Sequence, residues 1–286
     1  MSALRRAGVL GWPIEHSLSP VIHGLWLKRF GIAGRYERVA VEPERFAAET
    51  LRLLQEQGWR GMNVTAPHKE AAVRVVDRLD AAAERIGAVN TVVACADGRV
   101  EGRNTDLYGF RRNLETAAGW ERVGRRAAVV IGAGGASRAV VCALLDLGFK
   151  EVRILNRTVE KARALRDDLS VKEGMRLAPL SMDWAAPAME GADLLVNTTS
   201  LGMTGRGPLD LPLDPLPREA FVTDIVYAPL ETDLLTRARA RGHAVVDGLG
   251  MLLHQAVPGF EAWFEPPEPP AVDAELRAAV LAAMPG

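Results

Sequence analysis

A glycine-rich run is the first part of this chain whose residue types could do chemistry. Residues 132–137 read Gly-Ala-Gly-Gly-Ala-Ser and directly follow an apolar run that is typical of a buried strand. Bare glycine backbone can approach a pyrophosphate, and the N-terminus of a following helix favours its negative charge. The third glycine of the usual fingerprint is Ser137 here, so a tight turn without a ligand is the alternative.

A second polar run follows the next expected strand and bears on coenzyme choice. Dehydrogenases that prefer NAD usually carry an acidic residue there, whereas this chain has Asn156, Arg157 and Thr158. A guanidinium can form paired hydrogen bonds with a 2′-phosphate, which predicts NADP over NAD. Lys161, one helical turn beyond, is placed to reinforce that site. The alternative is that Arg157 is only a surface charge near a helix start.

Lys69 is a third candidate, because it ends a polar run after a short strand-like segment. Residues 63–69 read Asn-Val-Thr-Ala-Pro-His-Lys. In one interpretation Thr65 caps a helix, Pro67 lies in its first turn, and Lys69 is a solvated side chain. His68 is then expected at the surface. Asp106 is open to a similar interpretation as a helix cap, since it follows a hairpin signal and precedes a helical stretch.

The elements that must position these residues alternate between strand and helix patterns, which predicts an α/β protein. A first domain is expected over residues 1–106, around a mainly parallel sheet. Its expected strands are residues 6–11, 62–65 and 88–95, with a hairpin at Asp97-Gly98. Its expected helices run from Ser19-Pro20 to Gly31 and from Pro43 to Gly58.

The pattern restarts at Arg125 with a strand–helix–strand unit, which predicts a Rossmann-like dinucleotide-binding domain over residues 107–247. Its first three elements are expected at 127–131, 135–147 and 152–155. Later strands are expected at 194–197, 221–226 and 244–246, and a helix between Thr232 and Arg241. Residues 248–286 contain a helix over 249–264, a proline cluster and an alanine-rich helix, and we expect them to pack back on the first domain.

Composition narrows the classes of function. The chain has 286 residues, with 35 Lys and Arg against 36 Asp and Glu, so no overall positive charge favours nucleic acid. No run approaches the roughly twenty apolar residues of a membrane span, and the cytoplasm is the expected compartment. The two cysteines lie in apolar surroundings and are expected to be buried thiols. The five histidines have no metal-ligand spacing, so no metal is expected.

The chain resembles the shikimate dehydrogenase (shikimate/quinate dehydrogenase) family in motifs spread over its length. The matching segments are residues 11–20, 63–70, 87–91, 102–106, 132–138, 156–158, 197–203, 224–227 and 247–256. Members of that family use NADPH to reduce 3-dehydroshikimate reversibly to shikimate, a step in aromatic amino acid (chorismate) biosynthesis. The resemblance implies the same oxidoreductase activity, with NADP as coenzyme and a small-molecule substrate. It also implies that residues 1–106 form the substrate-binding and catalytic domain.

The resemblance also implies a catalytic pair, Lys69 and Asp106. Hydride reaching a ketone carbon leaves negative charge on its oxygen, and an ammonium can stabilise that charge and supply a proton. Asp106 is expected to hydrogen-bond a substrate hydroxyl and hold the ammonium. The two groups then titrate as a coupled pair.

Other matched positions are expected to surround the two ligands. Ser17 and Ser19 are expected to bind the substrate carboxylate, and Tyr227 is expected to close the site beside it. The alternative for Ser19 is a plain helix cap. The ring hydroxyls are assigned to Thr65, Asn90 and Gln255. The coenzyme is assigned to Gly132, Ala133, Gly134, Gly135, Ala136, Asn156, Arg157, Thr158 and Lys161, with Thr198, Thr199, Gly248 and Met251 near the nicotinamide half. Met251 as a core residue is the alternative, and Ala228 departs from the asparagine that members commonly carry after the tyrosine.

Two rival functions remain open from the sequence. A quinate or dual quinate/shikimate dehydrogenase shares most of the same motifs. A non-catalytic NADP-binding regulatory protein predicts loss of Lys69 or Asp106, and both residues are present. The oligomeric state stays open between monomer and homodimer.

Overall fold

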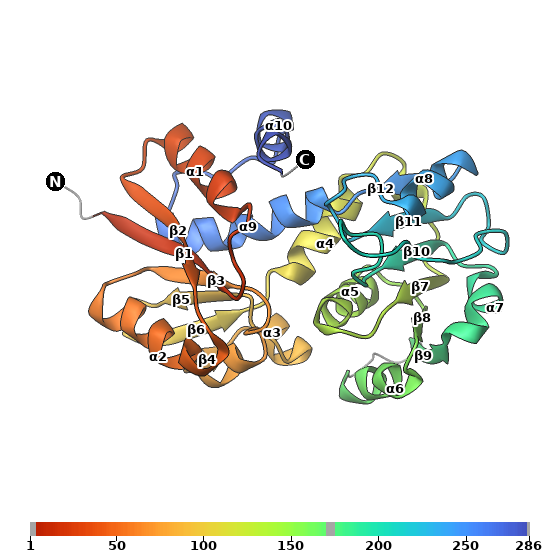
Figure 1. The fold of residues 1–286 in the computed structure, drawn as a ribbon, viewed down its shortest axis with the longest axis horizontal. Helices are drawn as coiled ribbons and strands as arrows, with labels where there is room; N and C mark the ends of the chain where they lie inside the picture. Colours follow the sequence, from red (N-terminus) through yellow and green to blue (C-terminus); the bar gives the residue numbers. More distant parts are fainter. Residues whose placement is uncertain (1–3, 170–174, 285–286) are drawn as a thin grey trace. The chain divides into compact units, whose positions relative to one another are not determined.

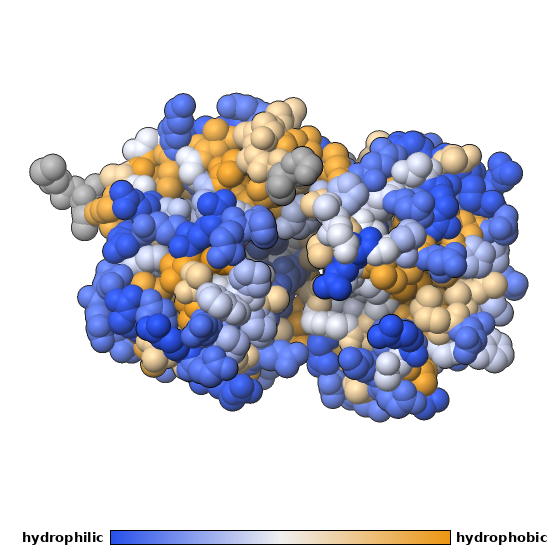
Figure 2. Space-filling view, in the orientation of Figure 1, coloured by the Kyte–Doolittle hydropathy of each residue, from blue (hydrophilic) through white to orange (hydrophobic). Residues whose placement is uncertain are grey.

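The chain forms two compact units in a computed structural model that describes residues 4–169 and 175–284 (Figure 1). The first unit runs to Thr105 and resumes at Leu253, and the second is Asp106–Leu252. The chain therefore leaves the first unit once and returns to it through its C-terminal helices. Hydrophilic side chains cover much of each unit's surface in this view, with smaller apolar patches between them (Figure 2).

The first unit is built on a six-stranded mixed sheet in the order β2-β1-β3-β5-β6-β4. The strands are β1 (Arg5–Gly11), β2 (Gly34–Ala40), β3 (Gly61–Val64), β4 (Arg78–Leu79), β5 (Thr91–Ala94) and β6 (Val100–Arg103). Strand β1 is parallel to β2 and β3, whereas β5 is antiparallel to β3 and β6. The expected hairpin at Asp97-Gly98 is confirmed, because it joins β5 to β6.

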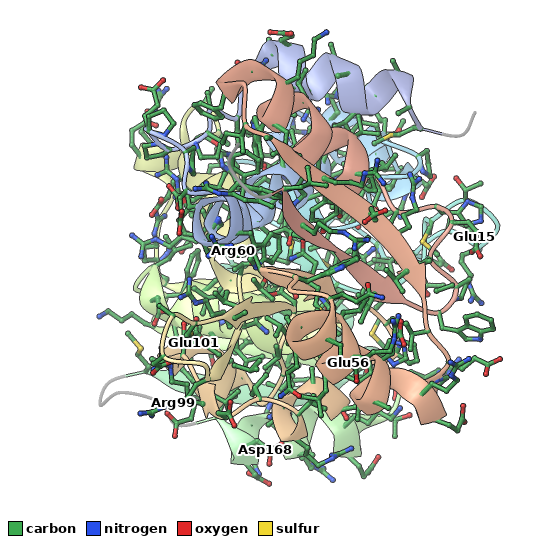
Figure 3. All side chains as sticks on the ribbon, turned by 90° about the vertical axis from the view of Figure 1, so that its left-hand side faces the viewer. Glu15, Glu56, Arg60, Arg99, Glu101 and Asp168 are labelled. Atoms are coloured by element: carbon green, nitrogen blue, oxygen red, sulfur yellow. The ribbon has the colours of Figure 1, made fainter. Side chains whose placement is uncertain are left out.

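Helices and shorter turns complete the first unit. They are α1 (Ser19–Phe30), η1 (Pro43–Arg45), α2 (Phe46–Leu51), η2 (Arg52–Glu56), η3 (Ala71–Arg74), α3 (Ala81–Ile86) and α10 (Ala274–Ala282), with most of α9 (Leu249–Phe264). Helix α1 ends at Gly31, whose φ of 60° suits a left-handed C-cap. Helix α10 is tied to α1 by an ion pair between Arg29 and Asp273 at 3.0 Å. Charged groups also link neighbouring strands. Glu101 of β6, which is labelled in Figure 3, accepts from Arg78 of β4 at 2.7 Å.

Helix α9 packs on the first sheet through aromatic side chains. Trp263, Phe260 and Phe264 are fully buried, and Trp263 Nε1 donates to the Val92 carbonyl at 2.9 Å. The indole occupies the space beside Gly61, where an added Cβ would lie 2.2 Å from Trp263 Nε1. Glycine is therefore required at position 61 for the helix to sit this close to the sheet.

The second unit is a six-stranded, wholly parallel sheet in the order β12-β11-β10-β7-β8-β9. The strands are β7 (Ala127–Ile131), β8 (Glu151–Asn156), β9 (Arg176–Ser181), β10 (Leu194–Asn197), β11 (Phe221–Asp224) and β12 (Val245–Val246). Its helices are α4 (Asp106–Glu115), η4 (Trp120–Arg122), α5 (Gly135–Asp146), α6 (Val159–Asp168), η5 (Met182–Trp184), α7 (Ala185–Met189) and α8 (Asp233–Ala240). This is the doubly wound order of Rossmann-like folds, and it reverses between β7 and β10, where ligands usually bind.

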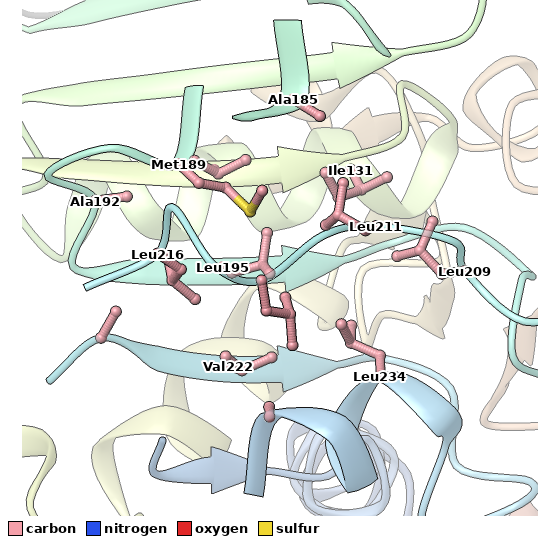
Figure 4. Packing of buried hydrophobic residues seen from close by; sticks show 14 of the residues in the cluster. Ile131, Ala185, Met189, Ala192, Leu195, Leu209, Leu211, Leu216, Val222 and Leu234 are labelled. Atoms are coloured by element: carbon pink, nitrogen blue, oxygen red, sulfur yellow. The ribbon is translucent and has the colours of Figure 1, made fainter. Parts of the chain in front are cut away.

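A buried cluster covers one face of this second sheet (Figure 4). Ile131, Leu195 and Val222 come from three neighbouring strands, and Met189 and Leu234 pack on them from α7 and α8. None of these five side chains is more than 2% exposed. The carboxyl ends of the strands are consequently held by a rigid interior, so the loops that leave them start from fixed points.

The packing at position 61 predicts the effect of a single methyl group. Gly61→Ala places a Cβ 2.1 Å from the Val92 carbonyl at a φ of +153°, so we expect a loss of about 3 kcal/mol in the free energy of unfolding. Gly24→Ala is the matched control, because Gly24 is an exposed position of α1 with open space around it. The control should gain about 0.5–1 kcal/mol from helix propensity. Urea unfolding measures both, and equal stabilities would contradict the packing described for α9.

Candidate active site

The candidate residues of the first unit lie in loops at one edge of its sheet. Leu10 of β1 pairs with Val64 of the parallel strand β3, so the loops after these strands leave from the same edge. They are joined there by hydrogen bonds from Thr65 N to Leu10 O at 2.9 Å and from Trp12 N to Ala66 O at 3.2 Å. The first loop carries Ser17 and Ser19, and the second carries Thr65 and Lys69.

Asn90 ties two further strands to this edge. Strand β5 starts here and β6 ends here, because Thr91 pairs with both Asn63 and Arg103. The Asn90 side chain is buried, its Oδ1 accepts from Thr105 N at 2.8 Å, and its Nδ2 donates to Thr105 Oγ1 at 3.1 Å. Asp106 is the next residue along the chain. The amide of Asn90 therefore fixes the backbone from which Asp106 starts.

Asn63 supports Asn90 from the neighbouring strand. Its Nδ2 donates to Asn90 O at 3.2 Å and to Thr91 Oγ1 at 3.0 Å, and its Oδ1 accepts from the Tyr36 hydroxyl at 2.6 Å. The ring of His23 stacks on Tyr36 at a centroid distance of 3.9 Å. No role was expected from the sequence for Asn63, Tyr36 or His23. The available signal was an asparagine inside an otherwise apolar buried strand.

Ser19 is not a helix cap. Helix α1 is capped at Leu18 without a side-chain hydrogen bond, and Ser19 is the first helical residue. Its amide donates to Ser17 Oγ at 3.4 Å, and Arg38 fixes the same loop by donating to Ser17 O at 2.9 and 2.6 Å. The capping alternative is wrong, because the first helical backbone bonds, from Val21 N and Ile22 N, go to Leu18 O at 3.0 and 3.3 Å.

The segment around Lys69 also differs from the expected helix. Pro67 lies in a turn, in which His68 N donates to Thr65 O at 3.0 Å, and the next helical element is η3. His68 is buried, against the expectation of a surface position, because its ring stacks on Phe46 at 4.5 Å and its Nε2 lies 2.8 Å from Val41 O. Lys69 O accepts from Val89 N at 2.9 Å. The Lys69 backbone is thus held beside Asn90, with its side chain partly exposed.

Gln255 reaches the same unit from α9. It is buried and lies eight residues before Trp263, about 12 Å back along the helix. The last turn of α9 lies at the start of β2, where an added Cβ on Gly34 would approach Phe264 to 2.9 Å. Gln255 therefore lies toward the opposite ends of these strands, from which the candidate loops leave.

In the second unit, the glycine loop opens directly from the end of β7. Gly132 has a φ of +112°, and an added Cβ would lie 2.7 Å from Thr198 Oγ1. Gly134 and Gly135, by contrast, are exposed, with no atom within 4 Å of an added Cβ. The twelve-residue helix α5 starts here. Open backbone at a helix N-terminus fits a dinucleotide pyrophosphate, so the residues present fit this coenzyme class.

Ser137 stands in place of the third glycine of the fingerprint, and its side chain forms hydrogen bonds. It is fully buried, and its Oγ accepts from Gly134 N at 3.0 Å and lies 2.6 Å from Thr198 Oγ1, which donates to Ile131 O at 2.7 Å. These hydrogen bonds connect the glycine loop to the end of β10. The departure from the glycine fingerprint therefore stabilises the loop.

The residues expected at the coenzyme's 2′-phosphate lie after β8. Arg157, Thr158 and Lys161 are exposed, and Asn156 Nδ2 donates to Thr158 O at 2.7 Å. Acidic groups of α6 pair with other cations, Glu160 with Arg163 at 3.6 Å and Asp168 with Arg138 at 2.9 Å. Arg157 and Lys161 therefore lie at the surface beside the end of β8.

Further candidates follow the ends of β10, β11 and β12. The hydroxyl of Thr199 donates to Asn197 Oδ1 at 2.8 Å, so it is engaged inside its own loop. Burial raises the pKa of Tyr227, which keeps the phenol a neutral donor at neutral pH. Gly248 leaves no room for a Cβ, which would lie 2.5 Å from Ile225 O, and Met251 is buried.

Two family models match this chain. The shikimate dehydrogenase substrate binding domain matches residues 9–92, and shikimate / quinate 5-dehydrogenase matches residues 116–202. The chain belongs to the shikimate dehydrogenase family. Proteins named shikimate dehydrogenase (NADP(+)) from Paramagnetospirillum magneticum and Rhodospirillum rubrum are 56% and 53% identical to it, over 97% of this chain and 98% and 97% of their own lengths.

Solved structures of family members share the fold. Shikimate 5-dehydrogenase from Thermus thermophilus, in complex with NADP(H) and shikimate, has a TM-score of 0.83 at 36% identity, covering 98% of this chain and 99% of that one. Quinate dehydrogenase from Corynebacterium glutamicum, in complex with NAD, has a TM-score of 0.87 at 30% identity, covering 97% and 99%. The shared fold thus includes proteins that are named for different substrates and whose structures contain different coenzymes.

Two other kinds of site are absent from the described residues. Across residues 4–169 and 175–284, no cluster of three His, Cys, Asp or Glu side chains is arranged to hold a metal ion. In the same part of the chain, no helix has the length and apolar character needed to cross a membrane.

The buried ring of His23 predicts a pH-dependent loss of stability. Burial lowers the pKa of His23 to about 3, so the folded state stays neutral while the unfolded chain gains a proton below its ordinary pKa of about 6.5. Its contribution to stability is complete above pH 6.5 and is lost as pH falls toward 3. Between pH 7 and 5 the free energy of unfolding should fall by about 2 kcal/mol on this account.

Urea unfolding at the two pH values measures this loss. His23→Phe keeps a ring against Tyr36 and should reduce the drop by about 2 kcal/mol, whereas His16→Asn, at an exposed position, should retain it. An unchanged pH dependence in His23→Phe would refute the assignment to this ring.

Proposed function

We propose that this chain is an NADP-dependent shikimate dehydrogenase that reversibly reduces 3-dehydroshikimate to shikimate in aromatic amino acid biosynthesis. The observation that carries the proposal is the near full-length similarity, at 49–56% identity, to relatives that bear this name. It is supported by the polar loops of the first unit and by the open glycine loop of the second.

Lys69 and Asp106 are proposed as the catalytic residues. When bound, NADPH supplies hydride to the ketone carbon of the substrate. Lys69 stabilises the negative charge that develops on the ketone oxygen and transfers a proton from Nζ to it. Asp106 accepts a hydrogen bond from a substrate hydroxyl and holds the ammonium in place. In the reverse direction, Lys69 Nζ takes the proton from the shikimate hydroxyl.

The substrate-binding assignments follow from the same loops. Ser17 and Ser19 donate hydroxyl hydrogen bonds to the carboxylate, and Tyr227, kept neutral by burial, donates beside them. Thr65, Asn90 and Gln255 bind ring hydroxyls. Asn90 shares its amide between Thr105 and the substrate, so its orientation is fixed before the substrate arrives.

The coenzyme assignments use the carboxyl ends of the second sheet. The backbone from Gly132 through Ala136 holds the pyrophosphate at the start of α5. Arg157 binds the 2′-phosphate, with Asn156, Thr158 and Lys161 around it. The nicotinamide half is held by Thr198, Thr199, Gly248 and Met251.

Location and assembly complete the proposal. Cys95 is partly exposed and Cys142 is buried, and they form no disulfide with each other, which is compatible with a reducing cytoplasm. We propose a cytoplasmic enzyme that acts as a monomer or homodimer on a small molecule.

A quinate or dual-specificity dehydrogenase is the second candidate, favoured by the TM-score of 0.87 to the Corynebacterium glutamicum enzyme. That structure contains NAD, whereas Arg157 in this chain favours a phosphorylated ribose. A non-catalytic NADP-binding regulator is the candidate from another class, and it would bind the coenzyme without turnover.

Steady-state assays of both alcohols with both coenzymes test the proposed function. We expect turnover with shikimate and NADP to exceed that with quinate or NAD by roughly 10-fold or more. Arg157→Asp should raise the KM for NADP by about 10- to 100-fold and change that for NAD much less. Arg163→Asp, the same charge change on the exposed face of α6, is the control.

Each alternative has its own outcome in these assays. Faster turnover of quinate would favour the second candidate. Coenzyme binding without turnover of either alcohol would favour the regulator. An unchanged coenzyme preference in Arg157→Asp would refute its role at the 2′-phosphate.

A further inference from the structure

Asp224 is a buried carboxylate to which the catalytic scheme gives no role. It ends β11, is 1% exposed, and accepts hydrogen bonds from three segments of the second unit. Its Oδ1 accepts from Asn197 Nδ2 and from Val226 N, both at 3.0 Å, and its Oδ2 accepts from Thr232 Oγ1 at 2.8 Å. Burial raises the pKa of Asp224, so a charge here is costly unless all three donors stay in place.

The first of these donors controls the loop after β10. The Asn197 amide is fully engaged, because its Oδ1 accepts from Thr199 N at 3.0 Å and from Thr199 Oγ1 at 2.8 Å. Its Nδ2 donates to Leu201 O at 3.1 Å in addition to Asp224. The orientation of this amide therefore sets the path of residues 197–201, which include the coenzyme candidates Thr198 and Thr199.

The second donor controls the segment after β11. Val226 directly precedes Tyr227, the candidate that closes the substrate site. Backbone bonds join this segment to the loop after β10, from Ile225 N to Asn197 O at 3.1 Å and from Thr204 N to Ala228 O at 2.9 Å. One carboxylate thus lies where the two candidate segments meet.

We propose that Asp224 is a positioning residue that fixes the loop after β10 relative to the Tyr227 segment. It acts through Asn197 and the Val226 amide and contacts neither ligand itself. The kinetic consequence rests on the proposed function, whereas the placement of the loops can be measured without it.

Asp193 provides a matched control in the same sheet. It too is buried, at the residue before β10, and accepts from Arg126 N at 2.8 Å and from the Arg126 guanidinium at 2.8 Å. It ties the amino ends of the strands, opposite to the ends from which the candidate loops leave. Its loss should reduce stability without disturbing those loops.

Asp224→Ala, Asp224→Asn and Asp193→Ala should be compared in the full-length protein. One readout is the rate of tryptic cleavage after Arg206, an exposed residue of the loop after β10, in the absence of ligands. The other is the dissociation constant of NADPH from fluorescence titration. We expect Asp224→Ala to raise both by about fivefold or more, because the donors from both segments lose their shared acceptor. Asp224→Asn keeps the Oδ1 acceptor, so both readouts should return most of the way to their wild-type values.

The control decides between positioning and general destabilisation. Asp193→Ala should lower the melting temperature while leaving both readouts within about twofold of the wild type. Equal changes in Asp224→Ala and Asp193→Ala would overturn the proposal. Where Asp224→Ala does not fold, Asn197→Ala breaks the same link from the other side, and unchanged cleavage after Arg206 in that variant would overturn it too. A wild type without shikimate turnover refutes the proposed function but leaves the cleavage measurement decisive.

Discussion

The buried amide of Asn90 is the contact on which the candidate substrate site depends. Its Oδ1 accepts from the backbone amide of Thr105 and its Nδ2 donates to the Thr105 hydroxyl, and the Val89 amide beside it donates to the carbonyl of Lys69. Asn63 supports it from the neighbouring strand. Loops that are distant in sequence therefore share one hydrogen-bonded frame. Buried polar groups are costly unless they are hydrogen-bonded, and the amides and hydroxyls at this edge bond to one another.

The second unit also holds its loops by hydrogen bonds from buried polar side chains, but with different residues. Ser137 and Thr198 clasp the glycine loop to the end of β10, and Asp224 joins the loops after β10 and β11. The apolar cluster below holds the strands, whereas the polar side chains orient what leaves them. Each unit consequently presents loops of defined shape at one edge of a sheet, as binding of a polar ring acid and a dinucleotide requires.

Much of the fold could be predicted from the sequence because its apolar runs are unambiguous. Strands β7 and β10 and helix α9 have the expected bounds, since each is a continuous apolar run or a long helical pattern. Strand β2 was not expected, because Arg35, Glu37 and Arg38 make this edge strand look like a loop. Helix α3 was also missed, being six residues long. The surface position expected for His68 was wrong, because its burial depends on Phe46 and Val41, which local pattern does not reveal.

The candidate site was predictable only as a set of residue types in motifs. Sequence spacing pointed to the glycine loop and to Arg157, whose chemistry follows from composition and position. The supporting roles of Asn63, Ser137 and Asp224 rest on distances between separate strands, which no local pattern contains.

Turnover by variants of Lys69 and Asp106 tests the catalytic assignment most directly. Lys69→Ala, Asp106→Ala and the double variant should be compared for kcat/KM in shikimate oxidation by NADP, with coenzyme affinity and melting temperature measured alongside. We expect each single change to reduce turnover by roughly 10² to 10⁴, and the double change to cost little more than the larger single one, because the two groups act as a unit. Near-normal turnover in a folded Lys69→Ala protein that still binds NADP, or strictly additive losses, would contradict the assignment.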